Sequence, residues 1–377
     1  MTLRDIIITT ESGFDALASD WRALEKQIPD LLPFQTFDWN RQWWRFFADT
    51  SLFHRDELAI CAIYANEKLV AVMPLCNTHI GFYQFHVYRY VRPFGADPNL
   101  TELRLPLALP PYKEMILRFW EAMSKQEIFG LAEFQLIHAQ AQAEHFLTSN
   151  QEIHPLSSRI IPNFVLPLSD DWSSFRTKLK RNIKESLRHC YNSLKRDQLQ
   201  PELKLIRGSE DLRKNIGQFF SLHAMRASAQ TNVSHPDYFS VPRHQEFIRA
   251  LLTSEFSHRC ILFSLELNGT PVAMRLGFSM NDELYLYYSG YDVAYSKYSV
   301  MTTLVSEIIQ WSITQSIPRI NLSVGEDVSK TRWSPEVINY VEYHCVRNNF
   351  LRRTFGQHIF RLRQWKKNSA MRKLNQA

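Results

Sequence analysis

One order of strand and helix patterns occurs twice along the chain, and this repetition limits the possible folds more than any other feature. The first half predicts a strand, two helices, a strand hairpin, a strand, a helix and a strand, at Arg4–Thr9, Phe14–Gln27, Trp39–Phe47, Leu58–Tyr64, Leu69–Leu75, Tyr88–Val91, Lys113–Ser124 and Glu133–Ile137. The second half predicts the elements Phe164–Leu168, Trp172–Lys195, Leu203–Arg207, Asp211–Met225, His244–Ser254, Cys260–Leu267, Pro271–Met280, Glu283–Tyr288, Val300–Thr314, Arg319–Leu322 and Ile338–Val346. Such duplication predicts two similar domains of mixed α/β class.

The length of the chain supports the same division. A chain of 377 residues exceeds what one hydrophobic core usually serves. We expect an N-terminal domain over 1–160, a C-terminal domain over 161–350 and a basic helix or tail over 351–377, with the junction near 150–163. Asn268-Gly269, between two of the predicted strands, is a strong two-residue turn signal.

Composition excludes several classes of protein. With 45% hydrophobic and 22% charged residues the chain is globular, and no window approaches the ~20 apolar residues of a membrane span. We therefore expect a cytoplasmic protein without a transmembrane segment. The five cysteines are scattered and never spaced as CxxC, which predicts buried, reduced thiols and neither a disulfide framework nor a metal site.

Positive charge is concentrated in two segments. Residues 176–196 contain eight Lys or Arg against the single acid Glu185, and residues 351–377 contain eight with no acid. Such concentration favours anionic partners: the phosphates of a cofactor, nucleic acid or a membrane surface. A solvated helix face is the alternative interpretation of each segment.

The stretch from Tyr285 to Trp333 is the most informative for chemistry. It runs from a strand through a polar loop to a helix and a second strand, and open α/β sheets bind ligands at such strand ends. Ser299 is suited to cap the helix, whose first amides belong to Val300, Met301 and Thr302. These amides could hold a phosphate, and ordinary helix capping is the alternative.

Short motifs along nearly the whole chain resemble one family. They are Trp39 with Trp43-Trp44, Ala71-Val72-Met73-Pro74-Leu75, Phe94-Gly95-Ala96-Asp97, Lys178 to Arg188, Tyr287-Tyr288-Ser289-Gly290-Tyr291-Asp292, Tyr298-Ser299, Asn321-Leu322-Ser323-Val324-Gly325-Glu326, Lys330 and Trp333. The chain resembles the GNAT-like acyltransferases of the CelD type, which take their name from cellulose-biosynthesis loci and are related in fold to the FemAB peptidoglycan transferases. The chain departs from the family pattern at four positions, where Val300-Met301 replaces Pro-Gly, Asn321 replaces Asp and Ser329 replaces Tyr. In addition, Glu326 follows Gly325 directly.

The resemblance implies a fold and an activity. The fold would be two tandem GNAT-like domains, each a mixed, mostly antiparallel sheet flanked by helices, with a non-catalytic first domain. The activity would be transfer of an acyl group, most simply acetyl, from acyl-CoA to an amine or hydroxyl acceptor bound in the second domain. The acceptor would be a small molecule or a saccharide of envelope polysaccharide biosynthesis.

Within this interpretation the reaction needs a base, a proton donor for the leaving thiolate and a phosphate cradle. Glu326 is the predicted base, because a carboxylate partly withdrawn from water at a strand end gains basicity, and a surface Glu in a turn is the alternative. Tyr291 and Tyr298 are the predicted donors. The predicted acyl-CoA contacts are Tyr288, Ser299, Val300, Met301, Thr302 and Lys330.

Acceptor binding is predicted for residues on three further elements. They are Lys178, Arg181, His223, Arg226 and Asp292. The basic helix, with Lys178, Arg181, Lys184 and Arg188 on one broad face, is predicted to steer coenzyme A or an anionic acceptor, or to bind an acyl-carrier protein. Trp333 is expected to be a packing residue.

Two rival functions remain open. FemAB kinship taken literally predicts an aminoacyl-tRNA donor, with RNA bound by the basic tail; outside this alternative, nucleic acid is not expected as a partner. The departures at Asn321 and Ser329 are compatible with a catalytically inactive binding protein that uses the tandem fold as an assembly surface.

Overall fold

The computed structural model describes residues 2–82, 85–95, 99–115, 131–139, 153–229, 235–347 and single positions between 354 and 369. The chain divides into two compact units. Unit 1 comprises Met1–Ile161 and Asn339–Ala370, and unit 2 comprises Pro162–Ile338 and Met371–Ala377. The boundary thus falls inside two long strands, β9 (Ile153–Pro167) and β15 (Glu336–Arg347).

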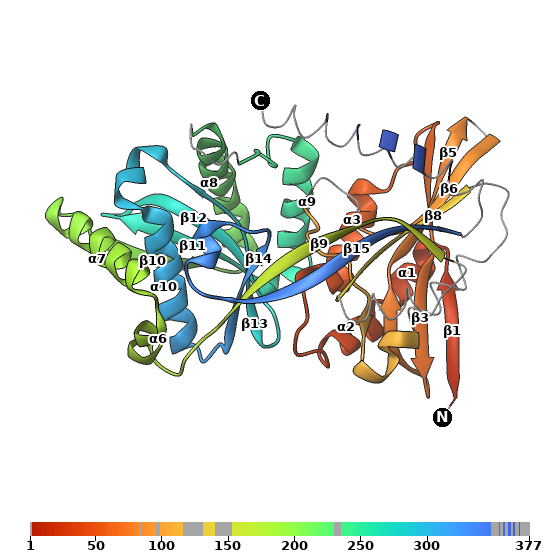
Figure 1. The fold of residues 1–377 in the computed structure, drawn as a ribbon, viewed down its shortest axis with the longest axis horizontal. Helices are drawn as coiled ribbons and strands as arrows, with labels where there is room; N and C mark the ends of the chain where they lie inside the picture. The colour runs from red at the N-terminus through yellow and green to blue at the C-terminus, as the bar shows by residue number, and fades with distance from the viewer. Residues whose placement is uncertain are drawn as a thin grey trace. The chain divides into compact units, whose positions relative to one another are not determined.

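Unit 1 combines two sheets with helices near its N-terminus (Figure 1). Its remaining elements are β1 (Leu3–Ile8), α1 (Glu11–Ala16), α2 (Ala18–Glu25), η1 (Pro33–Gln35), α3 (Phe37–Phe47), β2 (His54–Leu58), β3 (Ile60–Ala65), β4 (Lys68–Met73), β5 (Leu75–Phe82), β6 (Phe85–Pro93), β7 (Leu107–Ala108), η2 (Pro110–Tyr112) and β8 (Leu131–Ala139). One sheet has the order β1-β3-β4-β7, and the other contains β15-β8-β6-β5-β2. The predicted hairpin is confirmed as β3–β4, whereas most of the predicted helix Lys113–Ser124 lies outside the described residues.

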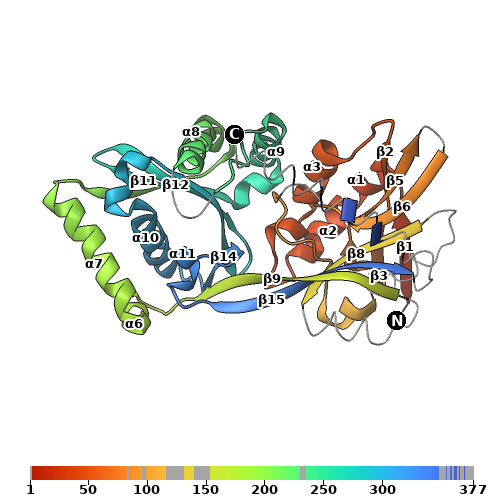
Figure 2. The same ribbon diagram turned by 45° about the horizontal axis from the view of Figure 1, so that its top comes forward.

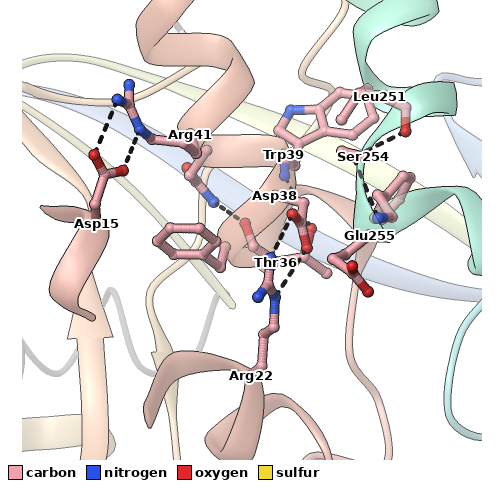
Figure 3. Close-up of polar contacts among 12 residues, drawn as sticks. Asp15, Arg22, Thr36, Asp38, Trp39, Arg41, Leu251, Ser254 and Glu255 are labelled. Carbon is pink, nitrogen blue, oxygen red and sulfur yellow. Dashed lines mark hydrogen bonds and ion pairs between the residues drawn. The ribbon is translucent and has the colours of Figure 1, made fainter. Parts of the chain in front are cut away.

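Aromatic packing and paired charges hold the helices of unit 1. The rings of Trp43 and Trp44 on α3 stack on Phe94 with centroids 5.0 and 5.3 Å apart, and both tryptophans are buried, as predicted. Figure 3 shows the polar side of these helices, where Arg22 pairs with Asp38 at 2.8 Å. These contacts show that the tryptophans form part of the hydrophobic core of unit 1.

Unit 2 has one continuous set of paired strands. Its elements are α6 (Trp172–Lys178), α7 (Arg181–Arg196), β10 (Pro201–Ile206), α8 (Ser209–Ser228), α9 (Pro242–Thr253), η3 (Glu255–Arg259), β11 (Cys260–Leu267), β12 (Thr270–Ser279), β13 (Glu283–Tyr291), η4 (Val293–Tyr298), α10 (Val300–Thr314), β14 (Arg319–Val324) and α11 (Val328–Thr331). The strand order is β10-β11-β12-β13-β14-β9, and β13–β14 is the parallel pair in it. The predicted β11–β12 turn is confirmed, with φ of 49° at Asn268 and 80° at Gly269.

Helices cover both faces of this sheet (Figures 1 and 2). On one face α7 and α10 enclose the main core with Leu284 and Leu286 of β13, Ile183 and Leu187 of α7, and Leu304 of α10, all buried. On the other face α8 packs on β13 and β12. The site-bearing strand β13 is therefore held from both sides.

Two predicted helices are each interrupted. The expected helix Phe14–Gln27 is wrong as one element, because α1 ends at Ala16 and α2 begins at Ala18. The expected helix Trp172–Lys195 is likewise wrong, because Leu179 and Lys180 are extended, with ψ of 142° and 151°. Leu179 is only 5% exposed, and leaving the helix at this point buries it in the core. Lys178 and Arg181 therefore lie on separate helices.

Two findings bear on the class of protein. In the part of the chain that the structure describes, no helix is both long and apolar enough to cross a membrane. The cysteines are buried free thiols, as predicted: Cys61, Cys76, Cys190, Cys260 and Cys345.

Candidate active site

The parallel strands β13 and β14 separate partway along their length. They pair at Glu283 with Arg319, at Leu284 with Ile320 and at Tyr285 with Asn321. Beyond Tyr285, β13 continues to Tyr291 without further pairing to β14 among the described residues. The carboxyl ends of both strands therefore have backbone groups that their neighbour does not use, which is where open α/β sheets bind ligands.

A β-bulge lies on β13 at the same point. The register with β12 shifts between Arg275 and Gly277, so that Tyr287 and Tyr288 together face the single residue Leu276. A bulge sets two residues against one, bends the strand and redirects the side chains that follow. The predicted donor-binding residue Tyr288 is therefore at an irregular, half-buried strand position.

Close approach of α8 to β13 brings a second group of polar residues to this strand end. A Cβ atom on Gly290 would lie 2.2 Å from the backbone nitrogen of His223 and 2.4 Å from the carbonyl carbon of Leu222. Only glycine permits this separation. The contact places the predicted acceptor residues His223 and Arg226 beside the last residues of β13.

His223 is held in one tautomer. Its Nδ1 lies 3.0 Å from the carbonyl oxygen of Ser289, and because a carbonyl only accepts, Nδ1 carries the hydrogen. Nε2 of the neutral ring then has a free lone pair; this atom is buried, has no hydrogen-bond partner and lies 3.8 Å from Asp237 Oδ1. Burial and the charge of Arg226 lower the pKa of His223, although the backbone carbonyls of Ser289 and Pro236 and the charge of Asp237 act in the opposite direction.

Arg226 joins the same group. Its Nη1 donates to Ser289 Oγ at 2.7 Å, and its Nη2 lies 3.3 and 3.2 Å from the two ring nitrogens of His235. Burial lowers the pKa of Arg226, against the attraction of Asp327 and Tyr291. Burial would raise the pKa of Asp327, but hydrogen bonds from Ser329 and the charges of His235 and Lys330 hold it below its usual value.

Sequence reasoning missed three members of this group. Ser289 lies inside the motif Tyr287–Asp292 and Asp327 directly follows the motif that ends at Glu326, so the motifs could have indicated both residues. His235 carried no such signal, and only the tertiary structure shows its ring against Arg226. Burial and the charge of Arg226 lower the pKa of His235 to about 4.

We expect unit 2 to lose stability as the pH falls from about 6.5 towards 4. An unfolded histidine titrates near 6.5, whereas folded His235 titrates at about 4. As the pH falls, the unfolded chain therefore binds the proton first, so the contribution of His235 to the free energy of unfolding is complete above about pH 6.5 and is lost below it. The loss should be about 1 kcal/mol, because His235 is partly exposed and solvent screens its charge. Urea unfolding at pH 7 and pH 4.5 should show a smaller decrease for His235→Gln than for wild type, and equal decreases would contradict this.

The start of α10 differs from its predicted form. Ser299 occupies the N-cap position of α10, as predicted, but it is in the left-handed region, with φ of 52° and ψ of 44°, and its side chain makes no capping hydrogen bond. The Thr302 amide donates to the Ser299 carbonyl at 2.8 Å. The amides of Val300 and Met301 have no acceptor within α10 and remain the candidates for an anion.

Arg332, which the sequence did not single out, lies at this end of α10. Its Nη1 donates to Thr302 Oγ1 at 3.2 Å. A cation beside the positive end of a helix is unfavourable by itself, so the arrangement favours a bound anion. The group of Val300, Met301, Thr302 and Arg332 therefore fits a phosphate.

Several predicted site residues make other contacts. Lys330 Nζ donates to Ser323 Oγ at 3.0 Å and to the Val324 carbonyl at 2.5 Å, and Tyr298 donates its hydroxyl hydrogen to Asp197 at 2.7 Å. Asp292 accepts from the amide of Ala294 and so orders the loop after β13.

Three further predicted residues lie outside this group of polar side chains. Lys178 and Arg181 contact Ser169 and Glu185, and the structure does not bring them together with His223. Trp333 is 3% exposed, which confirms it as a packing residue.

Glu326 does not have the environment on which its predicted role was based. It is exposed, directly after Gly325 with φ of 89°, so the expected withdrawal from water is wrong. Asn321, in contrast, is 1% exposed and donates from Nδ2 to Glu283 Oε1 at 2.8 Å. An amide at this position can donate to the carboxylate, which an ionised Asp could not.

Comparisons with known proteins identify a matching domain family and similar folds. Residues 175–331 match the family model described as "Acetyltransferase (GNAT) domain", and no curated protein matches the chain. The structure of FemX shares 10% identity, with 90% of this chain and 97% of that chain covered and a TM-score of 0.56.

Two further solved structures match over a similar length. A conserved protein of unknown function from Bacteroides thetaiotaomicron shares 13% identity, with 92% of this chain and 100% of that chain covered and a TM-score of 0.50. The C-terminal domain of a putative lysylphosphatidylglycerol synthetase from Agrobacterium fabrum shares 10% identity, with 90% and 95% covered and a TM-score of 0.51.

These matches establish the fold and its broad class. The expected architecture, tandem GNAT-like domains with mixed, mostly antiparallel sheets flanked by helices, is confirmed. The family match spans α8, the separating strands and the start of α10, and it supports an acyltransferase. The narrower resemblance to the CelD type remains a prediction.

Proposed function

We propose that unit 2 transfers an acyl group from acyl-CoA to an amine or hydroxyl acceptor at the point where β13 and β14 separate. The observation that carries this proposal is the separation itself, with the bulge at Tyr287–Tyr288 on one strand and the start of α10 following that strand after η4. One strand end thereby offers a backbone donor for a thioester oxygen and a helix terminus for phosphates. An acetyl donor and a saccharide acceptor stay predictions within this class.

The residues present fit acyl-CoA. Amides of Val300 and Met301, with the Arg332 guanidinium, would hold phosphate oxygens by charge-assisted hydrogen bonds. Backbone N–H groups on the edge of β13 that β14 leaves after Tyr285 would stabilise negative charge on the thioester oxygen as the acceptor attacks. When bound, acyl-CoA supplies the activated acyl carbon and a thiolate leaving group.

Two proton transfers accompany the acyl transfer. For the proton of the leaving thiolate we favour Tyr291 over Tyr298, because the Tyr298 hydroxyl is already engaged with Asp197. For the proton of the acceptor we favour His223, whose buried Nε2 has a free lone pair, over the exposed Glu326. Asp237 would stabilise the imidazolium that forms.

Thermal unfolding with candidate donors tests this function. A ligand at a hundred times its dissociation constant should add about 2.7 kcal/mol of stability. We expect stabilisation by acetyl-CoA or a longer acyl-CoA. Absence of stabilisation by any coenzyme A species, together with salt-sensitive binding of aminoacyl-tRNA, would support the FemAB-like alternative instead. Binding without turnover of any acceptor would support the inactive alternative.

Replacing Thr302 with Asp should weaken coenzyme A binding by about 10- to 100-fold. The new carboxylate would lie beside Arg332 and repel the phosphates, while an acid in the first turn of α10 keeps the helix stable. Calorimetric titration with coenzyme A measures the effect. Gln315→Glu, which adds the same charge at the exposed far end of α10, is the control and should bind normally. Wild-type affinity in Thr302→Asp would exclude this cradle.

A further inference from the structure

The outer face of α7 carries a row of cations. Arg181, Lys184, Arg188 and Lys195 recur at helical spacing and therefore project from one side of the helix, over about 21 Å of its length. We call these four residues the α7 stripe. The opposite side of α7 packs into the core through buried Ile183, Leu187, Cys190 and Leu194.

Most of this charge is not neutralised within the protein. Arg181 pairs with Glu185, but both side chains are exposed, at 92% and 58%, and such pairs contribute little. Lys184 Nζ donates to the backbone carbonyl of Thr177 at 2.8 Å, which leaves its charge in place. Among the described residues, no carboxylate pairs with Arg188 or Lys195. The stripe is therefore an electrostatic surface that attracts anions.

The other residues of the outer face limit the kind of partner. Asn182, Glu185, His189, Asn192 and Arg196 are polar or charged and exposed, so the face offers no apolar group to insert into a membrane. The tyrosine of α7, Tyr191, packs against the core and donates its hydroxyl hydrogen to Glu307 at 2.5 Å, so its ring is not part of the outer face on which a nucleotide base could stack. A narrow, linear row of cations fits instead the acidic helix of a protein.

The stripe leads to the proposed donor site. At the end of α7, Asp197 accepts a hydrogen bond from Tyr298 and lies 3.8 Å from Lys297 Nζ. Tyr298 immediately precedes Ser299 and the first amides of α10. A partner on the stripe would thus deliver a flexible phosphate-bearing arm to the same helix terminus that we assign to acyl-CoA.

We propose that the α7 stripe docks an acyl-carrier protein, an acidic protein that carries its acyl group as a thioester on a phosphopantetheine arm. This inference rests on the proposed function and gives the same site a second thioester donor, whose phosphopantetheine arm is chemically the same as that of coenzyme A. The acceptor nitrogen or oxygen forms a bond to the acyl carbon and loses its proton to the protein, the carbon–sulfur bond breaks, and the thiolate remains on the carrier and is protonated.

Binding of a fluorescently labelled holo-acyl-carrier protein to the full chain tests the inference. Wild type should bind, with affinity that falls as salt is raised, because exposed charges are screened. The triple variant Arg181→Glu, Arg188→Glu and Lys195→Glu should bind at least about tenfold more weakly. Its matched control carries the same charge change on α8 and α9, as Arg213→Glu, Lys214→Glu and Arg243→Glu at exposed positions, and should bind as wild type does.

Each other outcome overturns the inference. Equal loss in both triple variants would show a non-specific charge effect. Absence of carrier binding to wild type would reject the carrier as the partner. If the stripe variant instead lost binding to tRNA or to phosphatidylglycerol vesicles selectively, the stripe would belong to that partner. Thermal stabilisation by coenzyme A is measured in the same proteins: if it is present without carrier binding, the docking inference fails alone, and if both are absent, the proposed function fails as well.

Discussion

Replacing Gly290 with Ala should destabilise unit 2 by about 3 kcal/mol, the upper part of the range for overpacking a core. The added methyl group would lie 2.2, 2.4 and 2.6 Å from backbone atoms of Leu222 and His223, at distances that real side chains do not adopt. No flexible side chain can move aside, because every close atom belongs to the backbone of α8. The helix itself must therefore shift away from β13.

Gly217→Ala provides the matched control for this prediction. Gly217 lies in the same helix, and the nearest atom to an added Cβ is Arg249 Nη2 at 3.9 Å. Alanine favours a helix over glycine by about 1 kcal/mol, so this variant should be as stable as wild type or more stable. Urea unfolding of both variants measures the difference. A Gly290→Ala protein as stable as the control would show that α8 does not rest on β13 as described.

Replacing His223 with Asn should lower turnover by about 10²–10⁴, the usual contribution of a positioned general base. The Asn amide can still donate to the Ser289 carbonyl, as Nδ1 does, but it removes the lone pair of Nε2. Coenzyme A affinity and the thermal midpoint should change little. Steady-state kinetics with an acceptor that supports wild-type turnover measures the effect.

The pH profile separates this role from a purely structural one. The base must be neutral to act, and burial holds the pKa of His223 below its ordinary value. Wild-type turnover should therefore decrease only below pH 6.5, and the decrease should be absent from His223→Asn.

Glu326→Gln tests the rival base in the same assay. Since Glu326 is exposed, its substitution should have little effect. If Glu326→Gln instead loses about 10²–10⁴ of turnover and His223→Asn does not, the base is Glu326 and our preference for His223 is wrong.

Local patterns predicted most of the elements that surround the site. The spacing of apolar residues indicated α10 with its observed bounds, Val300–Thr314, and the Asn268-Gly269 turn indicated the β11–β12 hairpin. These features depend on nearby residues: helix periodicity buries one face, and a tight turn needs residues that tolerate positive φ. The break at Leu179 was not predicted, because the gain from burying that side chain depends on the core that receives it.

The sequence by itself determined the duplicated α/β order, the strand end that bears the candidate site and the residue types near it. Only the tertiary structure decided which of these residues meet. It exposes Glu326 to solvent and pairs the Tyr298 hydroxyl with Asp197. It also adds Arg332, which contacts Thr302 across 30 residues of the chain, and His235, which contacts Arg226 across nine. The physical reason is that burial, charge pairing and strand separation depend on contacts between segments that are distant in the sequence. The bulge on β13 and the close approach of α8 at Gly290 determine those contacts, and neither changes the local pattern of apolar and polar residues.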